Sequence, residues 1–295
     1  MAHGAGKGIL RGLLVLLPLL AGCGEEPAAP QPAVEPPLAG TEFDPATAGT
    51  ISGQVTWEGE LPVVPPFTAW LEPPSENELG HKELRPNPHA PVIEPHSRGV
   101  GNAVVFLRGV DPRRARPWDQ PPVRIVLDDY RFDVQQGETH GLTGFVRRGD
   151  AVEMVSAQAV FHSAHGQGAA FFTLAFPDAR QARSRRLQRN GLVELNSGAG
   201  YFWMRAYLFV DEHPYYTRTD AGGHFTLDRV PPGPCEVVCW LPHWQTTGHE
   251  RDPETSLVTR VTFRPPVETA QAVTLAPRQT AAVTFVLSPA AFAPR

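Results

Sequence analysis

The histidine pair His162-x-x-His165 is the clearest candidate for metal chemistry in the sequence. Imidazole nitrogens bind zinc well, but carboxylates from elsewhere would have to complete such a site, and two histidines alone do not make one. The motifs of common hydrolases and nucleotide-binding enzymes are absent. There is no Gly-x-Ser-x-Gly elbow, no His-Glu-x-x-His helix and no phosphate-cradling loop. We therefore expect a protein that is not an enzyme.

Two further groups of side chains could bind a ligand without catalysis. His243, Trp244, His249 and Glu250 could form a sugar-stacking surface, although an ordinary exposed loop has the same composition. Residues 178–190 carry several arginines that could bind an anion. A solvated loop or a single short helix is favoured there, because the charges would point in all directions around a helix. These arginines are Arg180, Arg183, Arg185, Arg186 and Arg189.

The first two dozen residues have the order of a secretory signal. Lys7 and Arg11 precede a short apolar stretch, Gly12 to Leu20, and the tetrad Leu20-Ala21-Gly22-Cys23 follows. The stretch is far shorter than the roughly 20 residues that a bilayer-spanning helix needs. The tetrad resembles the lipobox of bacterial lipoproteins, in which the thiol is acylated before cleavage. The alternative is an ordinary signal peptide with an incidental cysteine. The resemblance implies that residues 1–22 are removed and that lipid on Cys23 anchors the chain to a membrane.

Composition favours an all-β chain behind a tether. Residues 23–47 are rich in Pro, Ala and Glu and almost lack large apolar side chains, so we expect an extended tether there. The chain has 32 Pro and 27 Gly, short apolar runs and hardly any helical spacing. Removal of Lys7 and Arg11 with the signal leaves 24 basic against 31 acidic side chains, a formal charge of −7. That charge argues against nucleic acid as a partner.

Strand signals at the start of the folded part fall on both sides of a proline-rich segment. Thr50 to Trp57 alternates apolar and polar residues, which predicts one buried face. Asn102 to Leu107 is an unbroken apolar run, which predicts a strand covered on both sides. Between them, the prolines of Pro62 to Gly99 predict irregular structure. Further strand candidates are Val123–Leu127, Phe145–Val146, Ala151–Val155, Ala169–Phe176, Gly191–Leu195 and Tyr207–Val210.

The last part of the chain has the clearest turns. Thr219 to Leu227 predicts a hairpin turn that enters a strand, since two consecutive glycines permit a positive φ, and Val230-Pro-Pro-Gly-Pro234 predicts a second turn. Cys235 to Trp240 is the next strand candidate, and Ala270–Leu275 with Thr280–Leu287 predicts a closing hairpin. On one strand Cys235 and Cys239 would lie about 13 Å apart, whereas a disulfide needs about 7 Å or less. We expect them to be unpaired with each other.

These motifs carry a resemblance to two β-sandwich modules. TDAGGHFTLDRVPPGPCEVVCW, together with TISGQVTWEGELP, resembles the carboxypeptidase-regulatory-like module of the carbohydrate-binding-like fold. The longer order, from the lipobox through NAVVFL and a paired histidine to a Trp-Met and HPYYTRTDAGGHF, resembles bacterial envelope lipoproteins with a cupredoxin-like domain. The resemblance implies two sandwiches, a regulatory-like one from residues 48–112 and 213–289 and a cupredoxin-like one from residues 113–212.

The resemblance also assigns the copper ligands, and most of them are missing. Type 1 copper needs two imidazoles and a thiolate, with a weak axial thioether. His162 matches the first ligand histidine, and Trp203 and Met204 match the end of the motif. Gly198 stands at the cysteine and Tyr201 at the second histidine. We therefore expect no metal. The remnant candidates are His162, Met204 and His165.

The sequence thus predicts a non-catalytic cell-envelope lipoprotein that is held on the membrane by its N-terminal lipid, outside the cytoplasm. It would bind a protein or carbohydrate partner or act as a scaffold, and no cofactor is expected. The candidate ligand surface is Tyr201, Trp203, His243 and Trp244. The alternative is a copper-binding electron-transfer or copper-handling cupredoxin, in which His140 or His165 would join His162 and Met204.

Overall fold

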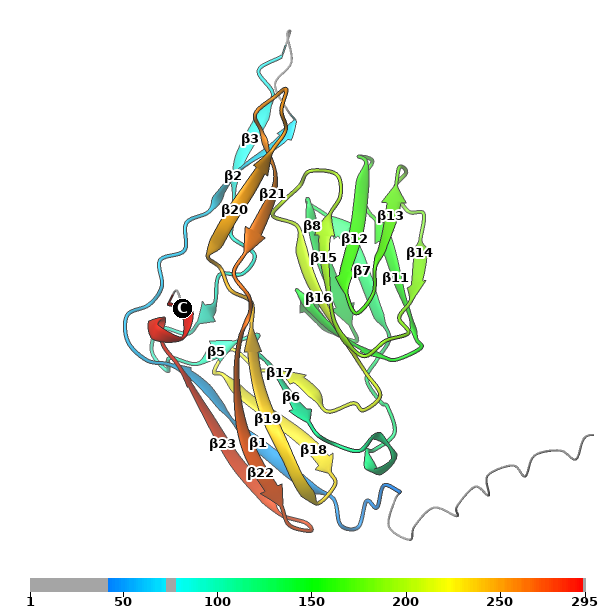
Figure 1. The fold of residues 1–295 in the computed structure, drawn as a ribbon, viewed down its shortest axis with the longest axis vertical. Coiled ribbons are helices and arrows are strands. Elements are labelled where there is room, and N and C mark those ends of the chain that lie inside the picture. Colours follow the sequence, from blue (N-terminus) through cyan, green and yellow to red (C-terminus); the bar gives the residue numbers. More distant parts are fainter. Residues whose placement is uncertain (1–41, 73–77, 294–295) are drawn as a thin grey trace, which may run out of the picture. The chain divides into compact units, whose positions relative to one another are not determined.

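A computed structural model describes residues 42–72 and 78–293, and this part is built almost entirely from β-strands (Figure 1). The strands form two β-sandwiches, which confirms the predicted all-β class. The predicted signal, Cys23 and most of the predicted tether lie outside the described residues. Between residues 42 and 293, apart from the gap at 73–77, no helix is long and apolar enough to cross a membrane.

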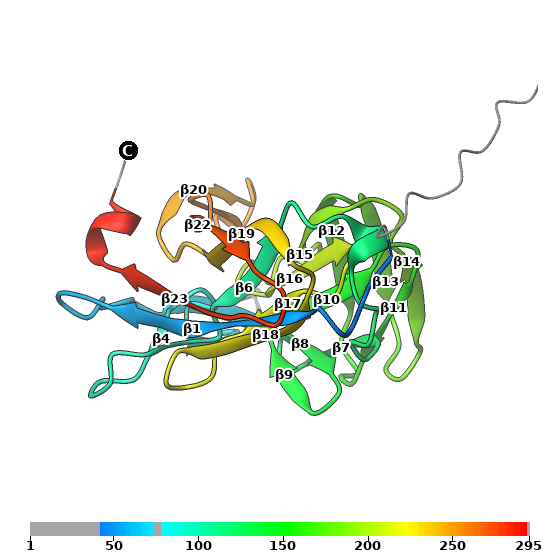
Figure 2. The ribbon, with the colours of Figure 1, turned by 90° about the horizontal axis from the view of Figure 1, so that it is seen from below.

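The first sandwich, which we call the terminal sandwich, combines strands from both ends of the described chain. β1 (Gly49–Trp57) lies between the antiparallel β18 (His224–Val230) and the parallel β23 (Thr280–Leu287), as Figure 2 shows. The facing sheet has the order β17-β6-β19-β22, with bounds Tyr216–Arg218, Val104–Arg108, Gly233–Leu241 and Val267–Leu275. Alternate residues of β1, such as Ile51 and Val55, fill the core between the sheets, as the sequence alternation predicts.

The second sandwich, which we call the middle sandwich, has two five-stranded sheets. One sheet has the order β10-β16-β15-β12-β13, with bounds Thr143–Arg147, Arg205–Asp211, Gly191–Ser197, His162–Gly168 and Phe172–Phe176. The other has the order β14-β11-β7-β8-β9, with bounds Arg183–Arg186, Ala151–Ser156, Val123–Asp128, Arg131–Gln136 and Thr139–Gly141. Each sheet contains one parallel pair, β10 with β16 and β7 with β11. Inward-facing side chains from both sheets, including Ile125, Met154 and Leu208, make one core.

An aromatic cluster joins the two sandwiches. Its residues, which we call the junction cluster, are Val104, Phe106, Phe145, Tyr207, Phe209, Tyr216, Val238 and Trp240. They come from β6, β17 and β19 of the terminal sandwich and from β10 and β16 of the middle sandwich. Because the other side chains of β6 face the terminal core, this strand is covered on both sides, and the prediction for the run from Asn102 to Leu107 is confirmed.

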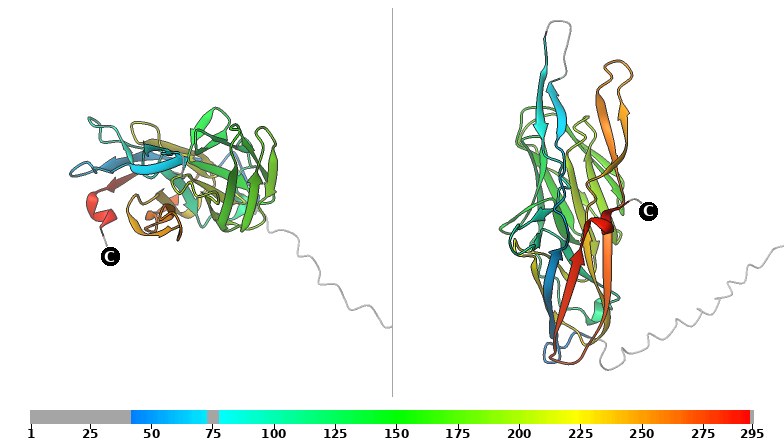
Figure 3. Two further views of the ribbon diagram at one scale, coloured as in Figure 1. Left: turned by 90° about the horizontal axis from the view of Figure 1, so that it is seen from above. Right: turned by 90° about the vertical axis from the view of Figure 1, so that its left-hand side faces the viewer.

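Two hairpins reach from the terminal sandwich onto the core of the middle sandwich (Figures 1 and 3). They are β2 (Phe67–Glu72) with β3 (His81–Arg85), and β20 (Thr246–Arg251) with β21 (Val258–Phe263). Residues 62–99 are therefore not irregular throughout, which corrects the prediction, and they also hold β4 (Val92–Ile93), paired with β5 (Val100–Gly101). The reason lies in FTAWLE, which alternates and contains no proline.

Residues 178–190 contain no helix, and the predicted solvated loop is interrupted by β14, a short strand at the edge of a sheet. The backbone of β14 pairs with β11, while every residue of β14 is exposed. An edge strand needs only one paired side, so charged side chains can stay in water there. Arg185 lies over the ring of Phe172, with its guanidinium carbon 5.5 Å from the ring centroid, and so covers the margin of the core.

The predicted closing hairpin is also wrong. β22 and β23 follow one another in the sequence, but β22 pairs with β19 and β23 pairs with β1, so they belong to opposite sheets. The Ala276 to Gln279 turn therefore crosses between the sheets instead of closing a ladder. Thr47, at the end of the predicted tether, accepts the backbone N–H of Arg278 at 2.9 Å and is held on this turn.

Candidate functional site

The first matched copper histidine, His162, is fully buried at the start of β12. Its Nε2 lies 3.1 Å from Oε1 of Gln158, which makes Nε2 the protonated nitrogen. Its Nδ1 is buried without a hydrogen-bond partner. The rings of Tyr130 and Tyr201 stand 5.7 and 5.4 Å from the imidazole. Burial lowers the pKa of His162, so the ring is neutral and Nδ1 carries a free lone pair.

The second matched segment, residues 198–204, is the loop between β15 and β16. It closes on itself, since the Met204 N–H donates to the Tyr201 carbonyl at 2.9 Å, and the Met204 side chain is buried in the middle core. Trp203 is buried as well, and its indole N–H donates to the carbonyl of Tyr130 at 2.9 Å. Tyr201 is half-buried against Tyr130 and Trp203, at centroid distances of 4.9 and 5.6 Å. Aromatic packing thus occupies the place where the resemblance assigns copper ligands.

These residues do not fit a type 1 copper centre. The backbone N–H of Gly198 donates to the carbonyl of Ser163 at 2.9 Å, so the loop keeps its place beside β12. A Cβ at Gly198 would lie 2.9 Å from the Ser163 Oγ, and no side chain at this position supplies a thiolate. Burial raises the pKa of Tyr201, so its phenol is protonated where an imidazole would be needed. Only His162 and Met204 remain as donors, fewer than copper requires.

The other candidate ligands lie elsewhere. His165 is three residues along β12 from His162, so the two side chains point to opposite faces of the sheet and cannot bind one ion. The His165 ring packs edge-on against Phe171 at 5.2 Å. His140 is exposed on β9, with its Nδ1 2.9 Å from an oxygen of Asp133. In the described part of the chain, no group of three or more His, Cys, Asp or Glu residues could hold a metal ion.

A cleft of about 280 Å³ opens beside this loop. The aromatic residues in its wall are Trp70 of β2 and Tyr201 and Trp203 of the loop. The other wall is the turn of the β20–β21 hairpin, including Asp252. Asp252 Oδ1 accepts the backbone N–H and the hydroxyl of Thr255, at 2.8 and 2.9 Å. These hydrogen bonds lower the pKa of Asp252, so it faces the cleft as a carboxylate.

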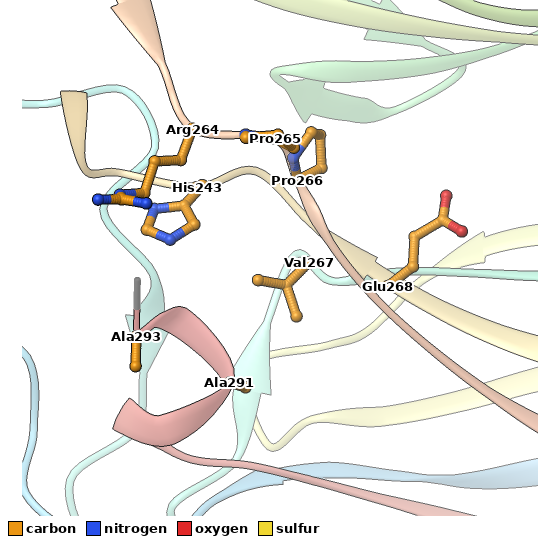
Figure 4. A pocket seen from close by; sticks show the side chains of 8 residues that line it. All are labelled: His243, Arg264, Pro265, Pro266, Val267, Glu268, Ala291 and Ala293. Carbon is orange, nitrogen blue, oxygen red and sulfur yellow. The ribbon is translucent and has the colours of Figure 1, made fainter. Parts of the chain in front are cut away.

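The predicted ligand surface is split between two places. His243 is buried and lines a different pocket of about 430 Å³, where Figure 4 shows it beside Arg264. Its Nε2 lies 3.2 Å from the Phe292 carbonyl and its Nδ1 accepts the Gln245 N–H at 3.1 Å, so both nitrogens are in use. Trp244 packs against Phe292 at 4.2 Å in the terminal sandwich. Only Tyr201 and Trp203 of the predicted surface share one cleft.

The two cysteines lie on one continuous strand, β19, as predicted, and neither forms a disulfide. Burial raises the pKa of Cys235 and raises that of Cys239 to about 12. A thiol of such high pKa is almost never a thiolate at neutral pH and is a poor nucleophile. Their roles are therefore in packing.

Comparisons with known proteins give weak matches to solved structures alone. No protein-family model matches the chain, and no curated protein matches it. Among solved structures, an amicyanin mutant in its Cu(I) form is 19% identical with a TM-score of 0.25, covering 30% of this chain and 81% of that chain. A purple cupredoxin from Nitrosopumilus maritimus is 13% identical with a TM-score of 0.24, covering 30% of this chain and 97% of that chain. The likeness is weak and partial. At these TM-scores it carries no argument about the fold or a ligand of this chain.

Proposed function

We propose that this chain is a non-catalytic envelope lipoprotein that binds a neutral glycan in the cleft formed by Trp70, Tyr201, Trp203 and Asp252. The middle sandwich would be a cupredoxin-like scaffold without copper, and the terminal sandwich a regulatory-like module. One observation carries the proposal: aromatic rings and a carboxylate from three separate segments line a single cleft.

The chemistry of this wall suits a sugar. Aromatic faces pack against the C–H face of a pyranose ring, and a carboxylate accepts hydrogen bonds from its hydroxyls. Trp70 is half-buried. All three hydrogen bonds to the Asp252 carboxylate reach Oδ1, so Oδ2 is free to accept. The negative charge of Asp252 opposes an acidic sugar at this point and favours a neutral one.

The test is binding of cellotetraose and chitotetraose to the full chain in detergent, measured by calorimetry. We expect saturable binding of one of these sugars and a loss of about tenfold or more in affinity for Trp70→Ala, because a tenfold loss is about 1.4 kcal/mol, the scale of one stacking contact. Asp252→Asn tests the hydroxyl acceptor. Phe171→Ala is the matched control, since Phe171 is an exposed aromatic residue outside the cleft. Equal affinity in wild type and Trp70→Ala would disprove the site.

Two features support a role without catalysis. The thiols of Cys235 and Cys239 are held protonated by burial. The buried imidazole of His89 is used in internal hydrogen bonds, with Nδ1 3.0 Å from the His243 carbonyl and Nε2 2.9 Å from the Tyr207 hydroxyl. Neither thiols nor imidazole are poised to attack or to transfer a proton.

Copper handling is the second candidate, and the unpartnered Nδ1 of His162 favours it. Metal analysis and optical spectroscopy of the wild-type chain decide between the two. We expect no stoichiometric copper and no intense blue band, because that colour needs a thiolate ligand. If Gly198→Cys with Tyr201→His gives a blue centre, the scaffold is a cupredoxin that lacks its ligands. Submicromolar, stoichiometric copper in the wild type would instead favour copper handling.

The membrane anchor is tested separately. The tetrad that ends at Cys23 motivates it, and Cys23→Ser should move the protein from the membrane fraction to the soluble fraction, because the acylated side chain is gone. Persistent membrane attachment of the variant would contradict the anchor without affecting the glycan site.

A further inference from the structure

A second cleft, of about 650 Å³, lies where the terminal and middle sandwiches meet. Arg218, the last residue of β17, lines it. The guanidinium reaches across to the middle sandwich, where Nε donates to the Thr143 hydroxyl at 2.8 Å and Nη1 donates to the Thr139 hydroxyl at 2.9 Å. Nη2 donates to the Thr143 carbonyl. The guanidinium carbon lies 4.8 Å from the centroid of the Phe145 ring.

Arg218 is partly buried and, unlike Arg85, Arg116 and Arg205, has no carboxylate partner. Arg85, Arg116 and Arg205 each form an ion pair with an Asp or Glu side chain. Among the described residues, Arg218 forms none. Burial lowers its pKa to about 10, which reflects the cost of holding this charge without a counter-charge.

The carboxylates that line the same cleft are engaged elsewhere. Asp228 lies 3.5 Å from Arg116 and 3.3 Å from Arg229 in ion pairs. Asp220 is exposed, and its Oδ1 accepts the backbone N–H of His224 at 2.8 Å. A guanidinium has five N–H donors, and three of those of Arg218 are used in the contacts above. One N–H on each terminal nitrogen remains.

We propose that this cleft binds a small oxyanion through Arg218. The planar fork of a guanidinium matches a carboxylate, sulfate or phosphate, and such a pair is strongest where water is excluded. His224 and His140 also line the cleft. The site is independent of the proposed glycan cleft, because the two share no lining residue.

The test titrates glucuronate, sulfate and phosphate into the full chain by calorimetry at constant ionic strength. Glucuronate carries its carboxylate on a sugar, whereas sulfate and phosphate are free ions. Comparing the three therefore shows whether the bound oxyanion belongs to a sugar or is a free inorganic ion. We expect saturable binding of at least one anion in the wild type. Arg218→Gln should weaken it tenfold or more, and Arg218→Lys should retain part of it, because a lysine keeps the charge and loses the fork. Arg124→Gln, an exposed arginine outside the cleft, should not change it.

A purely structural role for Arg218 gives a different result. In that case the Gln variant loses stability, but no anion binds the wild type in a saturable way. If Arg218→Gln does not fold, the readout is the Nε–H signal of Arg218 in the nitrogen-15 NMR spectrum of the wild type. This signal should shift as the anion is added, and the shift should saturate. Absence of saturable binding of all three anions, or equal binding by folded Arg218→Gln, overturns the proposal.

Discussion

His89 ties the stability of the protein to pH through a single buried imidazole. It is 2% exposed and packs 4.0 Å from the ring of Phe263. Desolvation lowers its pKa to about 3, against an ordinary value of 6.5, and its hydrogen bond to the His243 carbonyl opposes the shift only in part. The folded state therefore keeps the ring neutral in a range where the unfolded chain binds a proton.

The sign of the pH effect follows from that difference. The contribution of His89 to stability is complete above about pH 6.5 and is lost as the pH falls toward 3, because the proton is bound by the unfolded state alone. Between pH 6.5 and pH 4 we expect a loss of about 3 kcal/mol from this residue, at about 1.4 kcal/mol for each pH unit. Urea unfolding at several pH values measures it.

His89→Gln separates this effect from general acid destabilisation. The variant should be less stable than the wild type at pH 7, because it loses ring packing and the Tyr207 hydrogen bond, yet its stability should fall less between pH 6.5 and pH 4. His249→Gln is the control, since His249 is exposed on β20. A pH dependence that is equal in His89→Gln and wild type would rule out the assignment.

The sequence predicts some of the individual residues of the candidate site. The family motif locates His162, Tyr201 and Trp203 in the sequence. They also lie together in the structure, because the loop between β15 and β16 is held beside β12. It does not find Trp70 or Asp252, since these reach the cleft only when two hairpins fold onto the middle sandwich. Such packing joins segments far apart in sequence, and no local periodicity reports it. The alternation of FTAWLE is the one signal that could have placed Trp70 on a strand.

Strand β1 depends on a glycine at its centre. Gly53 pairs with Phe225 of β18 on one side and with Val283 of β23 on the other. A Cβ at this position would lie 1.7 Å from the Val283 carbonyl oxygen and 2.8 Å from the Phe225 ring. The three strands can approach this closely only because residue 53 has no side chain.

Gly53→Ala should therefore destabilise the protein by about 1–3 kcal/mol, the usual cost of forcing atoms into a packed site. Ser52→Ala, one residue away on the same strand, should change the free energy of unfolding by less than about 0.5 kcal/mol. Denaturant unfolding of both variants makes the comparison. A Gly53→Ala protein as stable as Ser52→Ala would show that the strands separate there without cost.

The sequence predicts the positions of the turns better than it predicts which strands pair. Gly223 has φ +80° and closes the Asp220 turn, and Gly233 has φ +132° at the start of β19, so both predicted turns are present. Each turn nevertheless joins strands of opposite sheets, as does the Ala276 to Gln279 turn. A turn sequence specifies a change of direction, whereas the core on either side decides whether the next strand pairs or crosses to the facing sheet.

The junction cluster couples the stability of the two sandwiches, so that each stabilises the other. Trp240 of β19 is 2% exposed, and its ring meets Tyr207 and Phe209 of β16 at centroid distances of 5.0 and 5.1 Å, nearly edge-on. Edge-to-face aromatic pairs stabilise beyond the area they bury. Each sandwich thus completes part of the other's hydrophobic surface.

Trp240→Ala should cost about 3–5 kcal/mol and divide the unfolding transition. The wild type should unfold in one step by calorimetry and by fluorescence, whereas the variant should show two steps, since the middle sandwich keeps its own core. Trp70→Ala is the control and should retain a single transition, because Trp70 is not part of the junction cluster. Two transitions already present in the wild type would contradict this coupling.

The parallel pairing of β1 with β23 has a consequence for how the chain acquires its structure. As the polypeptide emerges N-terminus first, residues 49–57 appear early, yet their partners are residues 224–230 and 280–287. Contacts of such long sequence separation form slowly, because closing the large loop between the strands costs entropy before the contacts can stabilise the structure. The middle sandwich, whose strands all lie within residues 123–211, is complete much sooner. Until the last strand is released, the edge of β1 that pairs with β23 stays unsatisfied, so this interval is the time when the nascent protein most needs a chaperone.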